Sequence, residues 1–437
     1  MDMIVRTGRR GDLGRHVRLP ALLAASVMAL CAAMAGHARP LAVAHYDIKA
    51  RLDPKAQTIA ADIAITLPAR EVGRETAFVL GDWMKIERID GGSGAKVRIE
   101  PTDKPFKGLN RIVFTWSRPP KAPVTLHFRY SGSTHAAADK PTLNPREGFE
   151  LGFEDGWAPV RPNFNLQFTA DADIEGVPPD EVAVAQGQVR HVGNRLVIHR
   201  GFEDLDMPFS ALTGLRKAAG PSVEVYARDL DGPQASVYRK VAGPIVAYYS
   251  KLFTPLPPSA LPARLVILPR QGAAYERRAY ISIADGTEEL KKLGHFEDWQ
   301  LAATVAHEFA HGWWSKGDPL TEDNWLNESF AEYSSLRFTE ATAGPDALKQ
   351  RLDRKREPAK TAGPIIGRGR PSKAASYAKG PLLLFDLDKE IGREKMDRLL
   401  RVLGRNPPTK TAQFLHALAE VAGPDVARKF EAQLRAP

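Results

Sequence analysis

Cysteine is almost absent from this chain. Its 437 residues include one cysteine, Cys31, close to the amino terminus. A single thiol cannot form an intrachain disulfide, so the sequence excludes the class of small domains held together by disulfides. Stability must then come from a large hydrophobic core or from a bound metal. The length and the 43% of hydrophobic residues are sufficient for such a core, divided over two or three domains.

A concentrated basic surface is also lacking. The formal net charge is +9, which is mild for this length. The sequence contains no compact basic stripe with interleaved aromatic residues, and it contains no internal repeat. We therefore expect no nucleic-acid partner.

Long hydrophobic runs are confined to the start of the chain. Residues 19–35 form an apolar, alanine-rich stretch that follows five arginines, and small residues at 33–35 or 36–38 offer a cleavage point. This pattern is typical of a secretory signal peptide over residues 1–38, and it predicts export to the periplasm or the extracellular space. The alternative is that the apolar stretch remains as a membrane anchor.

Alternating apolar and polar residues predict a β-rich first half. Apolar residues occupy every second position in 58–67 and 124–130, and a short apolar run spans 111–116. Clusters of proline, glycine and aspartate separate these runs, as in an all-β sandwich. We expect an antiparallel β-sandwich domain over residues 39–215.

After residue 220 helical and strand patterns are mixed. A helical pattern over 237–253 precedes a buried strand at 265–268, and residues 279–283 are predicted to form an edge strand. Such an edge can pair with an extended peptide backbone. We expect an α/β domain over residues 216–437, which makes the chain a multidomain α+β protein.

The most informative motif is His307-Glu308-Phe309-Ala310-His311. It ends a helix-favouring run without glycine or proline. Residues i and i+4 share one helical face, so two imidazoles at this spacing can bind one tetrahedral Zn²⁺. Glu308 lies about 100° round the helix, beside the position where a metal would hold water. The alternative is a pair of core histidines in an alanine-rich helix.

A third ligand is expected from a second helix over residues 324–333. Glu328 projects from its first turns, and Gly317 and Pro319 favour a reversal of the chain before it. Two histidines and one glutamate leave a fourth position for water, which is the form of a catalytic zinc site. Glu332 shares the face of Glu328. It either accepts a hydrogen bond from a ligand histidine or is an exposed charge.

Three motifs together resemble those of the aminopeptidase N family of gluzincin zinc peptidases. They are HEFAHGWW, WLNESFAEY and the Tyr-x-Lys-Gly pattern at 377–380. The resemblance implies a thermolysin-like catalytic domain behind the β-sandwich. The long carboxy-terminal helical-repeat domain of the family has no room after the last predicted helix, so we expect a short member.

The resemblance also implies residue roles. His307, His311 and Glu328 would bind one Zn²⁺ per chain, Glu308 would act as general base, and Tyr377 would stabilise the transition state. The sequence departs from the family in two places. The linker between the second histidine and the glutamate has 16 residues instead of the usual 18, and a serine replaces the glycine of the Asn-Glu-Gly motif. Neither change removes a metal ligand.

The motif by which this family recognises the substrate's amino end is poorly matched. The family pattern is Gly-x-Met-Glu-Asn, and Glu276 fits it only with an extra residue. Arg277 takes the asparagine position and Arg278 follows. By resemblance Glu276 would bind the free amino group, and the alternative is a surface carboxylate paired with those arginines. Glu150 is a second candidate for substrate binding.

A basic segment, residues 349–373, precedes Tyr377. Such a charge run predicts a solvated face, or else a border of the cleft that favours acidic or carboxylate-bearing substrates. The sequence as a whole predicts an exported zinc aminopeptidase that hydrolyses peptides with a metal-activated water. The alternatives are a zinc endopeptidase with relaxed amino-end recognition and a non-catalytic peptide-binding protein on a peptidase scaffold. A membrane partner is expected only if the apolar leader is retained.

Overall fold

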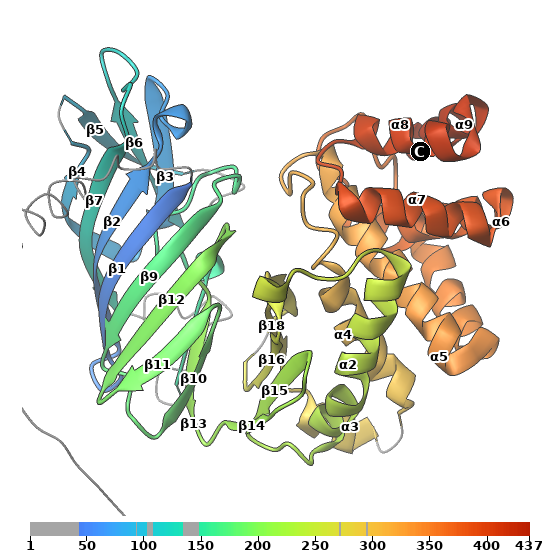
Figure 1. The fold of residues 1–437 in the computed structure, drawn as a ribbon, viewed down its shortest axis with the longest axis horizontal. Helices are drawn as coiled ribbons and strands as arrows, with labels where there is room; N and C mark the ends of the chain where they lie inside the picture. The colour runs from blue at the N-terminus through green and yellow to red at the C-terminus, as the bar shows by residue number, and fades with distance from the viewer. Residues whose placement is uncertain (1–42, 93, 103–107, 134–147, 271, 294–295) are drawn as a thin grey trace, which may run out of the picture. The chain divides into compact units, whose positions relative to one another are not determined.

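A computed structural model describes residues 43–437, apart from 93, 103–107, 134–147, 271 and 294–295 (Figure 1). The expected leader and Cys31 lie outside the described residues, so cleavage or anchoring stays a prediction. No helix in the described part of the chain combines the length and apolar character needed to cross a membrane.

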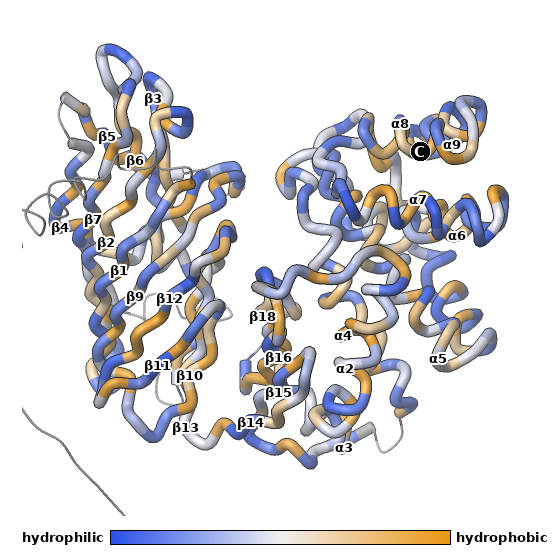
Figure 2. Tube along the Cα trace, viewed as in Figure 1, coloured by the Kyte–Doolittle hydropathy of each residue, from blue (hydrophilic) through white to orange (hydrophobic). Residues whose placement is uncertain are grey.

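The first half of the chain is built around a seven-stranded sheet with the order β11-β12-β9-β1-β2-β7-β4. Apolar residues alternate with polar ones along β1 and β2 (Figure 2). The apolar side chains are buried, as the period of two predicted. The strands are β1 (Ala44–Asp53), β2 (Thr58–Leu67), β4 (Met84–Asp90), β7 (Val124–Ser133), β9 (Phe168–Glu175), β11 (Gln188–Val192) and β12 (Arg195–Asp204).

Two three-stranded sheets complete this half, β3-β6-β5 and β10-β13-β8. Their strands are β3 (Glu75–Gly81), β5 (Lys96–Pro101), β6 (Leu109–Thr115), β8 (Gly148–Leu151), β10 (Glu181–Ala185) and β13 (Phe209–Thr213). Phe128 of β7 packs edge to face on Phe78 and Phe114 of the β3-β6-β5 sheet, so these two sheets share one core. The expected β-rich domain is confirmed. Among the described strands of this half, only the pair β1 and β9 is parallel rather than antiparallel.

The second half contains a five-stranded sheet with the order β14-β15-β16-β18-β17. Its strands are β14 (Arg216–Ala218), β15 (Val223–Ala227), β16 (Ala263–Leu268), β17 (Tyr275–Arg277) and β18 (Tyr280–Ala284). The prediction that residues 279–283 form the edge strand is wrong. A two-residue turn with Ala279 at φ 64° folds β17 back onto β18, so that β17 becomes the edge.

Helices surround this sheet and extend to the carboxyl end. They are α2 (Pro233–Leu252), α3 (Thr287–Leu293), α4 (Asp298–Ala310), α5 (Trp325–Lys360), the π-helical turn η6 (Ala375–Lys379), α6 (Gly380–Ile391), α7 (Arg393–Arg405), α8 (Thr411–Ala422) and α9 (Pro424–Arg435). Helix α5 is kinked at Gly344, whose φ of 83° is left-handed.

The helices that carry the HExxH motif and its expected third ligand, α4 and α5, are fixed by buried contacts. The hydroxyl of Ser335 on α5 donates to the carbonyl of Ala303 on α4 at 2.7 Å. The ring of Trp314, just after α4, packs on Phe330 of α5 with centroids 4.9 Å apart, and Phe330 in turn packs on Phe414 of α8. These contacts set the distance between the two faces that carry the candidate ligands.

Candidate metal centre

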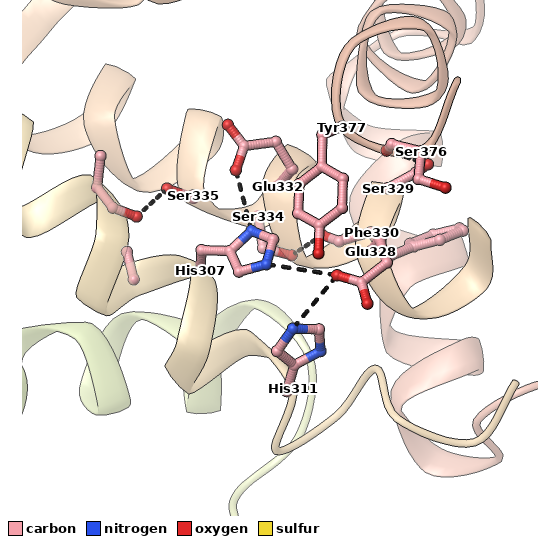
Figure 3. Close-up of polar contacts among 12 residues, drawn as sticks. His307, His311, Glu328, Ser329, Phe330, Glu332, Ser334, Ser335, Ser376 and Tyr377 are labelled. Atoms are coloured by element: carbon pink, nitrogen blue, oxygen red, sulfur yellow. Dashed lines mark hydrogen bonds and ion pairs between the residues drawn. The ribbon is translucent and has the colours of Figure 1, made fainter. Parts of the chain in front are cut away.

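Helices α4 and α5 bring His307, His311 and Glu328 together (Figure 3). The Nε2 atoms of the two histidines lie 3.6 and 3.7 Å from Oε2 of Glu328. The imidazole rings are 4.9 Å apart and nearly perpendicular, at 83°. Ligand atoms around a tetrahedral zinc with bonds of roughly 2.05 Å are about 3.3 Å apart. The three side chains therefore surround a point that one zinc ion fits with little movement.

One carboxylate oxygen of this group accepts no hydrogen bond within the described part of the chain. Oε2 of Glu328 is inaccessible to solvent and has no hydrogen-bond partner among the described residues. A buried carboxylate oxygen that accepts no hydrogen bond is costly, and a coordinated cation would remove that cost. Two imidazole nitrogens and one carboxylate oxygen, with a fourth position left over, are the donor set of a catalytic zinc site. The residues present fit the metal.

The electrostatics of these side chains point to the same conclusion. Burial lowers the pKa of His307, but the neighbouring carboxylates of Glu328 and Glu332 more than offset it and raise the pKa to about 10. Burial raises the pKa of Glu328, but the neighbouring imidazoles of His307 and His311 outweigh it and lower the pKa to about 2. The carboxylates thus favour positive charge among these side chains. The site is built to hold positive charge.

The Nδ1 atom of each imidazole also has a hydrogen-bond partner. Nδ1 of His307 lies 2.9 Å from Oε2 of Glu332, and Nδ1 of His311 lies 2.9 Å from the carbonyl oxygen of Trp314. Such partners fix the ring so that Nε2 faces the metal position. Of the two interpretations of Glu332, the structure therefore favours the hydrogen-bond acceptor over the exposed charge.

Sequence reasoning missed the cations that hold Glu332. Arg351 and Lys355, both on the second half of α5, lie 2.6 Å from Oε1 of Glu332. They belong to the basic segment that was expected to be either a solvated face or a border of the cleft. Their spacing of four residues, which puts both on one helical face, was the available signal.

Glu308 and Tyr377 lie beside the three candidate ligands. Glu308 is buried on α4. The Tyr377 ring stacks on His307, with centroids 5.6 Å apart and planes at 19°, and its hydroxyl points towards Glu328 (Figure 3). Burial and the Glu328 carboxylate raise the pKa of Tyr377, so its hydroxyl stays protonated and able to donate. The general-base role of Glu308 and the stabilising role of Tyr377 stay predictions.

The serine that departs from the family motif has a structural role here. Ser329 on α5 is buried and donates to the carbonyl of Ser376, next to Tyr377, at 2.7 Å. A Cβ on Gly380 would lie 2.0 Å from the Ser329 hydroxyl oxygen, so this glycine allows α5 and η6 to approach. Together they position the turn that carries Tyr377.

Glu276 lies on β17, the edge strand. Burial and the charge of Asp204 raise its pKa to about 8. The guanidinium of Arg277 pairs with Asp206 at 3.1 Å and lies over the Phe153 ring, while Arg278 lies over the ring of Phe202. Both cations are thus held by groups of the β-rich half. That Glu276 binds an amino group stays a prediction.

Glu150 lies in a buried network between the two halves of the chain. On β8, its Oε2 atom is 2.9 Å from Nε of Arg270, which follows β16. Its other oxygen accepts hydrogen bonds from the hydroxyls of Tyr275, at 2.9 Å, and Ser282. These partners give Glu150 a structural role; the substrate-binding role stays a prediction.

The chain folds into a β-rich domain followed by helices that bring two histidines and a glutamate together. Solved structures have a similar fold. A two-domain M1 zinc metallopeptidase mutant bound to L-arginine has a TM-score of 0.67 at 18% identity, covering 90% of this chain and 94% of that one. The M1 zinc metallopeptidase of Deinococcus radiodurans has a TM-score of 0.66 at 18% identity, covering 91% and 94%.

Native yeast LTA4 hydrolase has a TM-score of 0.71 at 16% identity, covering 92% of this chain and 69% of that one. The resemblance expected from the three motifs is therefore confirmed at the level of the fold. No protein-family model matches the sequence, and no curated protein matches it.

Proposed function

We propose that this protein is an exported zinc-dependent aminopeptidase that hydrolyses peptides. The observation that carries the proposal is the group of His307, His311 and Glu328, with Glu308 and Tyr377 beside it. A structurally similar M1 zinc metallopeptidase mutant from Deinococcus radiodurans is bound to a Tyr-Ser-Ala substrate, which supports peptides as the substrate class. The apolar pattern of residues 19–35 supports export.

The chemistry divides between the metal and the chain. A zinc ion held by the two histidines and Glu328 supplies Lewis-acid activation of water and of the scissile carbonyl. Glu308 accepts the proton of the attacking water and delivers it to the leaving amine. The Tyr377 hydroxyl donates a hydrogen bond to the oxygen on which negative charge develops.

The edge strand β17 supports action at the amino end. An edge strand can pair with an extended substrate backbone, and Glu276 on this strand offers a carboxyl group whose ionised form a free ammonium group would favour. The runner-up is an endopeptidase with relaxed amino-end recognition, because Arg277 stands where the family has asparagine. A non-catalytic binding protein is the third candidate, and the presence of Glu308 argues against it.

The test compares a free-amine tripeptide with its N-acetylated twin, each with and without a zinc chelator. We expect cleavage of the free-amine peptide alone, loss of that cleavage with chelator, and its recovery when zinc is added back. The variant Glu308→Gln should bind zinc and fail to cleave. Equal cleavage of both peptides would favour the endopeptidase. A sample with full zinc and no cleavage would support the binding protein.

A further inference from the structure

A cavity of about 490 Å³ opens next to the candidate metal centre. Its wall includes Trp299 and Ala303 of α4, Arg354 and Lys355 of α5, Lys373 and Tyr377. Because the Tyr377 ring also stacks on His307, this one side chain contacts both the cavity and the candidate metal centre.

The wall carries more positive than negative charge. Arg351 and Lys355 share the single carboxylate of Glu332. Arg354 and Lys373 also line the cavity, and neither pairs with a carboxylate in the part of the chain that the structure describes.

Nearby carboxylates on α5 are engaged elsewhere. Asp353 pairs with Lys349 and Arg356, and Glu357 pairs with Lys360. Arg354 and Lys373 thus remain available to a ligand. The Arg354 guanidinium also lies over the Trp299 ring at 6.0 Å, which holds this cation at the cavity wall.

The position of the cavity suits the leaving end of a short peptide. Ala303 and Trp299 precede His307 by one and two turns of α4, or about 6 and 12 Å along the helix. An extended peptide advances about 3.3–3.6 Å per residue, so a leaving part of one to three residues would carry its terminus over this distance. The carboxylates of Glu276 and Asp204 belong to other elements and do not line the cavity.

We propose that this cavity binds the terminal carboxylate of the leaving part of the substrate through Arg354 and Lys373. The protein would then prefer unblocked peptides of two to four residues, with the ammonium at β17 and the carboxylate in the cavity. The inference rests on the proposed function, because it assigns a substrate class to the same cleft. A carboxylate satisfies an arginine fork and a lysine ammonium with charge-assisted hydrogen bonds.

The test measures kcat/KM for three tripeptides with a free amino group. One has a free carboxyl terminus, one is its carboxamide, and one is a carboxamide with aspartate after the cut. The double variant Arg354→Gln/Lys373→Gln is compared with the double variant Arg356→Gln/Lys360→Gln. The second variant removes two exposed cations of α5 that do not line the cavity.

We expect the wild type to favour the free acid over the carboxamide by about tenfold or more, since hydrogen bonds between charged groups are stronger than those to a neutral amide. The ratio should fall towards one in the first double variant and stay unchanged in the second. Equal rates for acid and amide in an active wild type would overturn the cavity's role and leave the aminopeptidase intact.

Two further results decide the remaining cases. If acid and carboxamide react equally and only the aspartate peptide is favoured, the terminal carboxylate is overturned as the ligand and the cavity binds an acidic side chain. If no peptide is cleaved, the proposed function fails, and calorimetric binding of acid and amide to the Glu308→Gln protein still decides the cavity. Tighter binding of the acid supports it, and equal binding rejects it.

Discussion

At the scale of single residues, the site is a balance of buried charges. Burial raises the pKa of Glu332, but Arg351 and Lys355 more than offset it and hold the pKa well below its usual range. Glu332 therefore stays ionised and keeps its bond to Nδ1 of His307. Removing either cation would weaken the support of a candidate ligand without touching the metal position itself.

Tyr377→Phe tests the residue assigned to transition-state stabilisation. Its hydroxyl lies outside the group of three ligands, so we expect the variant to bind zinc as the wild type does. Loss of one such donor costs about 3–4 kcal/mol of barrier, so kcat should fall by roughly two to three decades. Metal content by atomic absorption and kcat on a free-amine peptide give the answer. Near-normal turnover would remove the assigned role.

At the scale of elements, the critical contact is between α5 and the turn η6. The buried bond from Ser329 to the Ser376 carbonyl and the close approach of Gly380 position the turn that carries Tyr377. A π-helical turn within helical structure is frequent at functional sites. Here the turn carries the tyrosine that stacks on His307.

Gly380→Ala should destabilise the protein through this contact. Its new Cβ would overlap the Ser329 side chain, which is short and buried, and overpacking of this kind costs about 1–3 kcal/mol. Ser329→Gly removes the overlapping atoms. The loss of unfolding free energy in the double variant should therefore be smaller, by about 1 kcal/mol or more, than the sum of the losses in the two single variants. Urea unfolding of all three variants measures this coupling.

Gly243→Ala in α2 is the matched control. A Cβ there meets no atom of another described element within 4 Å, so only the gain in helix propensity and the crowding by the following Pro244 act on it, and we expect a change within about 1 kcal/mol. If Gly380→Ala behaves like this control, the tight packing of η6 against α5 is not what requires glycine.

At the scale of the whole molecule, buried polar contacts connect the β-rich half to the half that carries the metal centre. The pair of Glu150 and Arg270 is almost completely buried, with 4% and 1% of the side chains exposed. The hydroxyls of Ser210 and Tyr280 also bond to each other across these two halves. Burial of this kind makes the contacts sensitive to the loss of one partner, because the other charge is left without compensation.

Glu150→Gln should therefore cost about 3–5 kcal/mol in the free energy of unfolding. Glu87→Gln is the control, since Glu87 pairs with Arg129 on the exposed surface of the β-rich half, and its loss should cost about 0–1 kcal/mol. Urea titration compares the two. A normal unfolding free energy with a raised KM for free-amine peptides would instead make Glu150 a substrate-binding residue.

The sequence by itself determined what depends on local periodicity. Residues 307 and 311 share a face in any α-helix, and the alternation along 58–67 buries one face in any sheet. For this reason the two histidines, the approximate place of Glu328 and the β-rich first half could be predicted without coordinates.

Only the tertiary structure decided which partner each charged side chain meets. In the sequence, Arg277 and Arg278 are two cations beside the carboxylate that would bind an ammonium group. In the structure, groups of the β-rich half bind both of them. Arg351 and Lys355 looked like part of a solvated run, yet they hold Glu332 behind His307. Electrostatic partners are determined by proximity in space, and segments far apart in the chain supply them. A local pattern such as the four-residue spacing of Arg351 and Lys355 therefore shows which charges share a helical face and not which partner they meet.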